Sequence, residues 1–185
     1  MSWIREIEPD AAEGELRTVY DELERRRGKV ANILKVHSLR PNALRAHLAL
    51  YMDLMFAPGG LTRRQRELIA VTVSRENGCG YCVAHHREAL ARYVTDTALL
   101  NAISQQPEPQ DLDSAERALC AYAVKLTRTP HAMSEGDVTA LREAGFTDAD
   151  TLLVNLIVAY FNFVNRIALG LGVTFDANEV HGYQG

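Results

Sequence analysis

Apolar residues recur along the chain at the spacing of α-helices. In residues 13–27 the side chains of Leu16, Val19 and Leu23 share one face, and charged side chains cover the other. A short helix or turn is expected at residues 30–39, and helices are expected at residues 42–57, 62–77, 80–94, 96–103, 113–126, 134–143 and 147–170. No segment shows the alternation of a strand, so the sequence predicts an all-α fold of about eight helices.

A chain of 185 residues is the usual size of one domain and is long enough to bury a core without disulfides. We expect a single domain with its core at about residues 40–130 and a linker at residues 105–110, which hold two prolines. Residues 1–39 are expected to form an N-terminal helical extension, and residues 131–172 are expected to form the C-terminal helices. The closing residues 173–185 have no periodicity and are expected to form a tail.

Charge and polarity narrow the possible partners. The chain has 20 basic and 24 acidic residues and no basic stripe interleaved with aromatic residues, so we expect no nucleic-acid partner. The longest apolar run, residues 151–171, is interrupted by Asn155, Asn162, Asn165 and Arg166. A bilayer tolerates such groups poorly, so we expect a buried helix of a soluble protein and no membrane partner. The start MSWIREIEPD does not resemble a signal peptide, and three cysteines in such a chain fit a cytoplasmic location.

The segment ELIAVTVSRENGCGYCVAHH carries the candidate chemistry. Its first helix places Glu67 at the head of an apolar run that fills nearly every side, so the carboxylate is expected in low-dielectric surroundings. Asn77-Gly78 ends this helix, and the next one starts at Gly80. Cys79 and Cys82 therefore lie at a helix N-terminus, where unpaired amides and the helix dipole favour a thiolate.

The spacing within this segment suits thiol redox chemistry. Cys82 and His86 are four residues apart on one helix and share a face, so the imidazole can activate the thiol. Cys79 precedes Cys82 in a CxxC arrangement that allows a disulfide at a helix start. In an antiparallel hairpin, Glu67 returns to about the height of His86, given a rise of roughly 1.5 Å per residue. The carboxylate can then orient the imidazole or accept its proton.

These residues and their spacing resemble the signature of the AhpD-like alkylhydroperoxidases in the carboxymuconolactone decarboxylase superfamily. The segments NILKVHSLRPNAL, LTRRQRELIAVTVSRENGCGYCVAHH and FNFVNRIALGLGV are similar to its peroxidase-related branch, so the resemblance covers the chain from about Ile4 to Val173. It implies an all-helical fold, assembly as trimers or hexamers, and an active site near a subunit contact.

The resemblance also implies roles for individual residues. Cys82 would be the peroxidatic thiol and Cys79 the more accessible resolving thiol, with Glu67 and His86 in a proton relay. One departure is that well-studied members carry a histidine next to the second cysteine, where this chain has Tyr81. Tyr81 donates a hydrogen bond but is no base at neutral pH, so the activation of Cys79 is expected to differ. His85, about 100° around the helix from His86, is expected at the surface or an interface, and it and Tyr81 are supporting residues.

The leading interpretation is a thiol peroxidase without a cofactor or bound metal, which reduces hydroperoxides through Cys82 and Cys79. It requires an external dithiol reductant, and we expect a homo-oligomer, as a dimer, trimer or hexamer. Two enzymatic alternatives are a thiol:disulfide oxidoreductase acting on a protein or lipoyl-like disulfide and a lactone decarboxylase. The non-enzymatic alternatives are two buried structural thiols and a zinc site that adds His85 or His86, for which a fourth ligand is missing.

Overall fold

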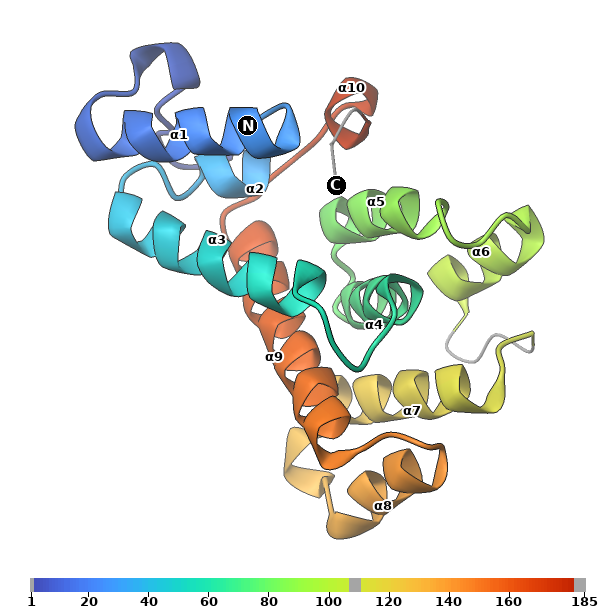
Figure 1. Ribbon diagram of the computed structural model, residues 1–185. Helices are drawn as coiled ribbons and strands as arrows, with labels where there is room; N and C mark the ends of the chain where they lie inside the picture. The colour runs from blue at the N-terminus through green and yellow to red at the C-terminus, as the bar shows by residue number, and fades with distance from the viewer. Residues whose placement is uncertain (1, 107–110, 182–185) are drawn as a thin grey trace. The chain divides into compact units, whose positions relative to one another are not determined.

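The computed structural model describes residues 2–106 and 111–181, and within these residues the chain is helical without strands (Figure 1). This confirms the all-α prediction. The α-helices are α1 (Gly14–Arg27), α2 (Asn32–Lys35), α3 (Pro41–Phe56), α4 (Arg63–Glu76), α5 (Gly80–Leu90), α6 (Thr97–Gln105), α7 (Ser114–Arg128), α8 (Glu135–Glu143), α9 (Asp148–Gly170) and α10 (Ala177–Val180), with 3-10 turns at Pro9–Ala11 and Pro130–Ala132.

The chain divides into two compact units. The first consists of Met1–Met52 and Arg166–Gly185, and the second of Asp53–Asn165. The divisions fall inside α3 and α9. All the candidate site residues lie in the second unit. Of the linker expected at residues 105–110, residues 107–110 lie outside the described residues.

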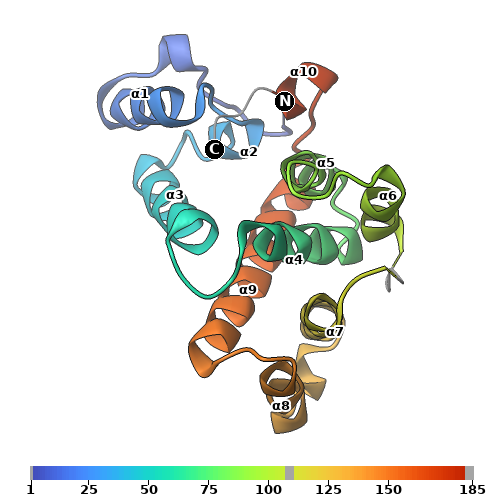
Figure 2. The same cartoon turned by 45° about the vertical axis from the view of Figure 1, so that its right-hand side comes forward.

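Helix α4 is the centre of the second unit, where it packs against α5, α6 and α7 (Figures 1 and 2). Every residue from Arg66 to Ser74 is buried, as expected for a helix that is apolar on nearly all sides. Leu68 and Val71 of α4 belong to an apolar cluster that also contains Leu90 of α5 and Ile103 of α6. The apolar run next to Glu67 therefore places this carboxylate inside the core.

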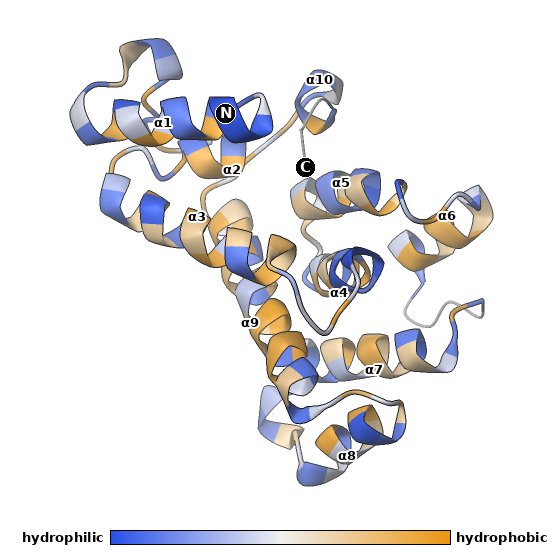
Figure 3. Cartoon of the chain, in the orientation of Figure 1, coloured by the Kyte–Doolittle hydropathy of each residue, from blue (hydrophilic) through white to orange (hydrophobic). Residues whose placement is uncertain are grey.

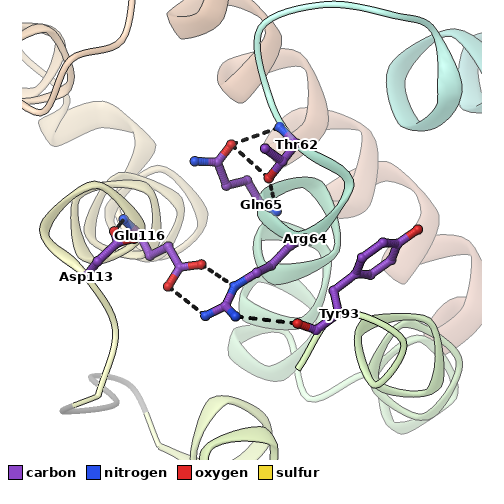
Figure 4. A network of polar contacts seen from close by, with 6 residues as sticks. All are labelled: Thr62, Arg64, Gln65, Tyr93, Asp113 and Glu116. Atoms are coloured by element: carbon purple, nitrogen blue, oxygen red, sulfur yellow. Dashed lines mark hydrogen bonds and ion pairs between the residues drawn. The ribbon is translucent and has the colours of Figure 1, made fainter. Parts of the chain in front are cut away.

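The start of α4 is fixed by a capping box. The Thr62 Oγ1 accepts the Gln65 N–H at 3.2 Å, and the Gln65 side chain accepts the Thr62 N–H at 2.9 Å (Figure 4). One residue into the helix, Arg64 donates hydrogen bonds of 2.5 and 3.0 Å to the two carboxylate oxygens of Glu116. This bidentate pair connects α4 with α7, because Glu116 lies in the first turn of α7.

Helix α5 follows its predicted start but ends early. It was expected to run to Val94, whereas the α-helix ends at Leu90. The Leu90 carbonyl accepts both the Tyr93 and the Val94 N–H, at 2.9 and 3.0 Å, so residues 91–93 form a tighter turn. The site residues lie before this point and are not affected.

Helix α9 contains the predicted long apolar run. Hydrophobic residues predominate along this helix (Figure 3). By length and composition it could cross a membrane, and 44% of its most apolar 18 residues are buried inside the fold. Its amides bind groups of other helices: Asn155 donates to the Tyr122 hydroxyl at 2.9 Å, and Asn162 donates to Thr127 Oγ1 at 3.0 Å. These two amide groups therefore find hydrogen-bond partners within the helical fold.

The first unit differs from expectation at its C-terminal end. Residues 173–185 are expected from the sequence to form a tail without helical periodicity, but Ala177–Val180 forms the single-turn helix α10, capped by Asp176. Lys29 Nζ donates to the carbonyls of Asn178, Glu179 and His181 at 2.9, 2.6 and 2.6 Å. Cations stabilise a helix C-terminus, so a residue of the N-terminal region holds this turn in place.

Candidate functional site

The turn between α4 and α5 positions the cysteine pair. Gly78 has φ +66°, which only glycine adopts readily, and its N–H binds the Arg75 carbonyl at 2.9 Å. The Cys79 N–H reaches back to the Ser74 carbonyl, also at 2.9 Å, which completes a Schellman motif at the end of α4. Cys79 is therefore anchored to α4 while it serves as the N-cap of α5, and Cys82 lies in the first turn of α5.

The two thiols are buried and interact with each other. Cys79 is 1% exposed and Cys82 is 2% exposed, and both are in the free thiol form. A hydrogen bond with the Cys82 thiol lowers the pKa of Cys79 to about 7, although burial opposes this shift. The backbone N–H groups of Cys82 and Tyr81 and the charge of His85 act in the same direction as that hydrogen bond.

The same contact has the opposite effect on the second cysteine. The hydrogen bond with Cys79 raises the pKa of Cys82, and burial and the negative charge on Cys79 raise it further. Cys79 is therefore the first thiol of the pair to ionise, and the Cys82 thiol donates a hydrogen bond to the Cys79 sulfur. The free amides of the first turn add to this asymmetry, because the backbone N–H groups of Cys82 and Tyr81 face the N-cap residue Cys79.

Glu67 and His86 meet across the hairpin, at the height that the sequence predicted. The imidazole Nδ1 of His86 lies 2.7 Å from Glu67 Oε2. Glu67 Oε1 accepts hydrogen bonds from Arg63 Nε and from its terminal nitrogen at 2.8 and 2.6 Å. The carboxylate is 0% exposed, so its two oxygens find their partners inside the protein.

These partners keep Glu67 ionised. Burial acts to raise the pKa of the carboxyl group, but the charges and hydrogen bonds of His86 and Arg63 outweigh burial and leave the pKa lowered. A carboxylate only accepts hydrogen bonds, so Nδ1 of His86 carries a proton. In the neutral imidazole the other nitrogen, Nε2, is then the base. The ring of Phe161 meets the imidazole edge-on, with 4.6 Å between centroids, and restrains its orientation.

Tyr81 and His85 form a stacked pair beside Cys79. Their rings are 4.2 Å apart at an interplanar angle of 22°, and His85 Nδ1 lies 2.7 Å from the Tyr81 carbonyl oxygen. Tyr81 is buried, and His85 is partly buried rather than at the surface. Through its charge His85 contributes to the lowered pKa of Cys79, so it belongs to the surroundings of this thiol.

Two residues near the site were not among the predicted site residues. Arg63 is recognisable in the sequence, because it precedes Glu67 by one helical turn and such pairs form ion pairs. The Asn165 side chain forms a hydrogen bond with the Cys82 thiol, and it comes from α9, far along the chain. A buried amide in an apolar helix signalled that Asn165 needs partners, but it could not identify them.

The third cysteine, Cys120, is buried in α7, and its sulfur lies 3.5 Å from Thr72 Oγ1. Burial raises the pKa of Cys120 to about 11. Among the residues that the structure describes, no group of three or more His, Cys, Asp or Glu side chains is arranged to hold a metal ion.

Comparison with known proteins identifies the family and supports the fold. The model of the carboxymuconolactone decarboxylase family matches residues 41–123. The chain is similar to the alkylhydroperoxidase AhpD core of an uncharacterized peroxidase-related protein from Ralstonia eutropha JMP134, at 31% identity and a TM-score of 0.87, with 97% of this chain and 94% of that chain covered.

Two further solved structures are similar. An uncharacterized peroxidase-related protein from Silicibacter sp. TM1040 shares 30% identity over 90% of this chain and 87% of that chain, with a TM-score of 0.82. A putative antioxidant defence protein AhpD from Agrobacterium tumefaciens shares 25% identity over 76% of this chain and 95% of that chain, with a TM-score of 0.67. No functionally curated protein matches the chain. By identity, coverage and fold, the chain belongs to the carboxymuconolactone decarboxylase family, among its AhpD-like, peroxidase-related members.

Proposed function

We propose that this protein is a thiol-dependent peroxidase that reduces hydroperoxides through Cys82 and Cys79. The observation that carries the proposal is the hydrogen-bonded thiol pair at the start of α5, in which the pKa of Cys79 is lowered to about 7. The pair shares its hairpin with a buried Glu67–His86 contact of 2.7 Å. The peroxidase-related and antioxidant names of the relatives support the same class of chemistry.

In the first step His86 acts as the base. The contact with Cys79 and burial raise the pKa of Cys82, so this thiol needs a base to ionise it. We assign that role to Nε2 of His86, which lies four residues further along the same face of α5. The Cys82 thiolate attacks the terminal oxygen of the hydroperoxide. The S–O bond forms while the O–O bond breaks, and the alkoxide leaves as the alcohol with the proton from His86. Cys82 is then a sulfenic acid.

In the second step Cys79 resolves this intermediate. Its thiolate attacks the Cys82 sulfur, the S–S bond forms, the S–O bond breaks, and hydroxide leaves to become water. A pKa of about 7 makes about half of Cys79 a thiolate at neutral pH and suits this task. An external dithiol returns both sulfurs to the reduced state. We further propose that the protein is cytoplasmic, because such reductants are available in that compartment. We also propose that it forms a homo-oligomer.

Single substitutions test the proposal. We expect that Cys79→Ser and Cys82→Ser each abolish turnover of an alkyl hydroperoxide with dithiothreitol as reductant. Cys120→Ser is the matched control and should retain turnover, because Cys120 is buried with a pKa raised to about 11. Trapping with dimedone should detect a sulfenic acid in Cys79→Ser but not in Cys82→Ser. Full peroxidase activity in Cys82→Ser would overturn the proposal.

A thiol:disulfide oxidoreductase is the second candidate, and the lowered pKa of Cys79 favours it as well. Rates measured with an alkyl hydroperoxide and with oxidised lipoamide, at equal concentrations, distinguish the two activities. A lactone decarboxylase is a further candidate, because the matching family is named after such an enzyme. That activity would survive alkylation of both thiols, whereas the two redox activities would not.

A further inference from the structure

Asn165 of α9 is an amide in the core of the second unit, at 0% exposure. Its Oδ1 accepts a hydrogen bond from Asn77 Nδ2 at 2.9 Å, and its Nδ2 donates to Ser74 Oγ at 3.1 Å. Both partners belong to the end of α4 and the turn that anchors Cys79. The position of the amide is therefore fixed by the segment that positions the thiol pair.

These two bonds also fix which way the amide faces. Because Asn77 Nδ2 is a donor, the oxygen of Asn165 must face it, and the NH₂ group faces away from it. One N–H of this group is used by Ser74 Oγ, and the side chain forms a further hydrogen bond with the Cys82 thiol. The second N–H is thus the donor available to a sulfur that changes its charge in every redox step.

We propose that Asn165 is a further catalytic residue, which stabilises negative charge on the Cys82 sulfur when the Cys79–Cys82 disulfide is reduced. This inference rests on the proposed redox function of the pair. An external thiolate attacks the Cys79 sulfur and forms a mixed disulfide. The Cys79–Cys82 bond breaks, and its electron pair remains on Cys82, which leaves as a thiolate that accepts the Asn165 N–H.

The surroundings of Cys82 explain why a donor is needed there. Cys82 is 2% exposed, so water does not solvate the departing charge. The hydrogen bond with Cys79, burial and the charge on Cys79 all raise the pKa of Cys82, whereas Asn165 lowers it. A donor that is already held in place by Asn77 and Ser74 stabilises the leaving thiolate without reorganisation.

The test is the rate at which dithiothreitol reduces the preformed disulfide of the full-length protein. A hydrogen bond to a charged group predicts that Asn165→Ala slows this step by about ten-fold or more. Asn155→Ala is the matched control, because it removes an amide hydrogen bond to Tyr122 on the same helix, and it should leave the rate unchanged. If Asn165→Ala does not fold, Asn165→Ser is used in its place, with the same expectation.

A second measurement separates the chemical role from a structural one. In the Cys79→Ser background, adding Asn165→Ala should move the midpoint of Cys82 alkylation to higher pH, and adding Asn155→Ala should not. An unchanged reduction rate in folded Asn165 variants, or equal slowing in Asn155→Ala, would overturn the inference. The disulfide is formed with a chemical oxidant, so a protein without peroxidase activity can still show slower reduction in the Asn165 variants. Failure of the proposed peroxidase function and failure of this inference therefore give different results.

Discussion

Three cysteines of one chain differ in reactivity because their sulfur atoms meet different neighbours. The Cys79 sulfur is next to a thiol donor and the free amides of a helix start, so its negative charge is stabilised. Cys82 is the donor in the same pair, and Cys120 lies in an apolar cluster next to Thr72. Burial is common to all three and therefore does not explain the difference.

Alkylation of the native protein should follow this order. With iodoacetamide under reducing conditions, Cys79 is expected to react first, with a half-maximal rate near pH 7, because the hydrogen bond with the Cys82 thiol lowers its pKa to about 7 against the opposing effect of burial. Cys120 should remain unmodified below pH 9, since burial raises its pKa to about 11. Peptide mass spectrometry measures both. Modification of Cys120 before Cys79 would contradict the prediction.

Glu67 should contribute to stability in a pH-dependent way. Its pKa is lowered in the folded protein, so its contribution is fully present above the usual value of 4.5 and is lost as the pH falls through the folded value. Glu67→Gln leaves Arg63 without its buried partner and should cost about 3 kcal/mol at pH 7. Urea unfolding at pH 7 and pH 3 should show that the difference in the free energy of unfolding between wild type and Glu67→Gln is smaller at pH 3. A difference in the free energy of unfolding that is the same at both pH values would contradict this prediction.

At the scale of the elements, the α4–α5 hairpin depends on one backbone conformation. The left-handed φ of Gly78 lets the chain reverse so that Cys79 both closes α4 and caps α5. A side chain at Gly78 would meet no atom within 4 Å, so only backbone strain opposes a substitution there. A substitution at Gly78 therefore tests the backbone conformation of the turn without changing side-chain packing.

Gly78→Ala is therefore expected to cost about 1–2 kcal/mol in the free energy of unfolding. Gly80→Ala is the matched control, because it too would meet no atom within 4 Å but does not need a left-handed conformation. We expect Gly80→Ala to be neutral or slightly stabilising. Denaturant unfolding checks both variants, and equal effects at the two glycines would show that the turn does not need Gly78.

In the first unit, a histidine pair links α2 and α3. His47 Nδ1 lies 3.2 Å from His37 Nε2, and His37 Nδ1 lies 2.9 Å from the Ile33 carbonyl oxygen. Burial and the charge of His37 lower the pKa of His47 to about 3, and burial lowers the pKa of His37. Neither imidazole accepts a proton readily in the folded protein.

The pair should make the protein sensitive to mild acid. With folded pKa values below the unfolded value of about 6.5, the contribution of the pair is fully present above pH 6.5 and declines below it, by up to about 1.4 kcal/mol per pH unit for each histidine. His47→Gln should reduce the loss of stability between pH 7 and pH 5, whereas His131→Gln, at an exposed position, should not. An identical pH dependence in wild type and His47→Gln would contradict this.

At the scale of the whole molecule, local sequence signals predicted most of the helices. The Thr62 capping box, the stop at Gly28 and the apolar faces each act within one or two turns, so they can be read without tertiary structure. Helix α10 was missed because four residues show no periodicity, and a distant lysine holds it in place.

In the candidate site too, some contacts could be predicted from nearby sequence and others depend on tertiary packing. Glu67 and His86 could be paired from the sequence, because a hairpin with a known turn fixes their heights. The contact of Asn165 with Cys82 joins α9 to α5 and depends on tertiary packing. The order of the two thiol pKa values depends on which sulfur donates to the other, and residue spacing alone does not determine this.

The central claim is that hydroperoxide oxidises the Cys79–Cys82 pair directly. The most direct test mixes the reduced protein with one equivalent of cumene hydroperoxide and follows thiol loss and peptide masses with time. The account predicts loss of two thiols, formation of a Cys79–Cys82 disulfide, an intact Cys120, and a rate far above that of free cysteine. Oxidation at the rate of free cysteine, or without that disulfide, would contradict it.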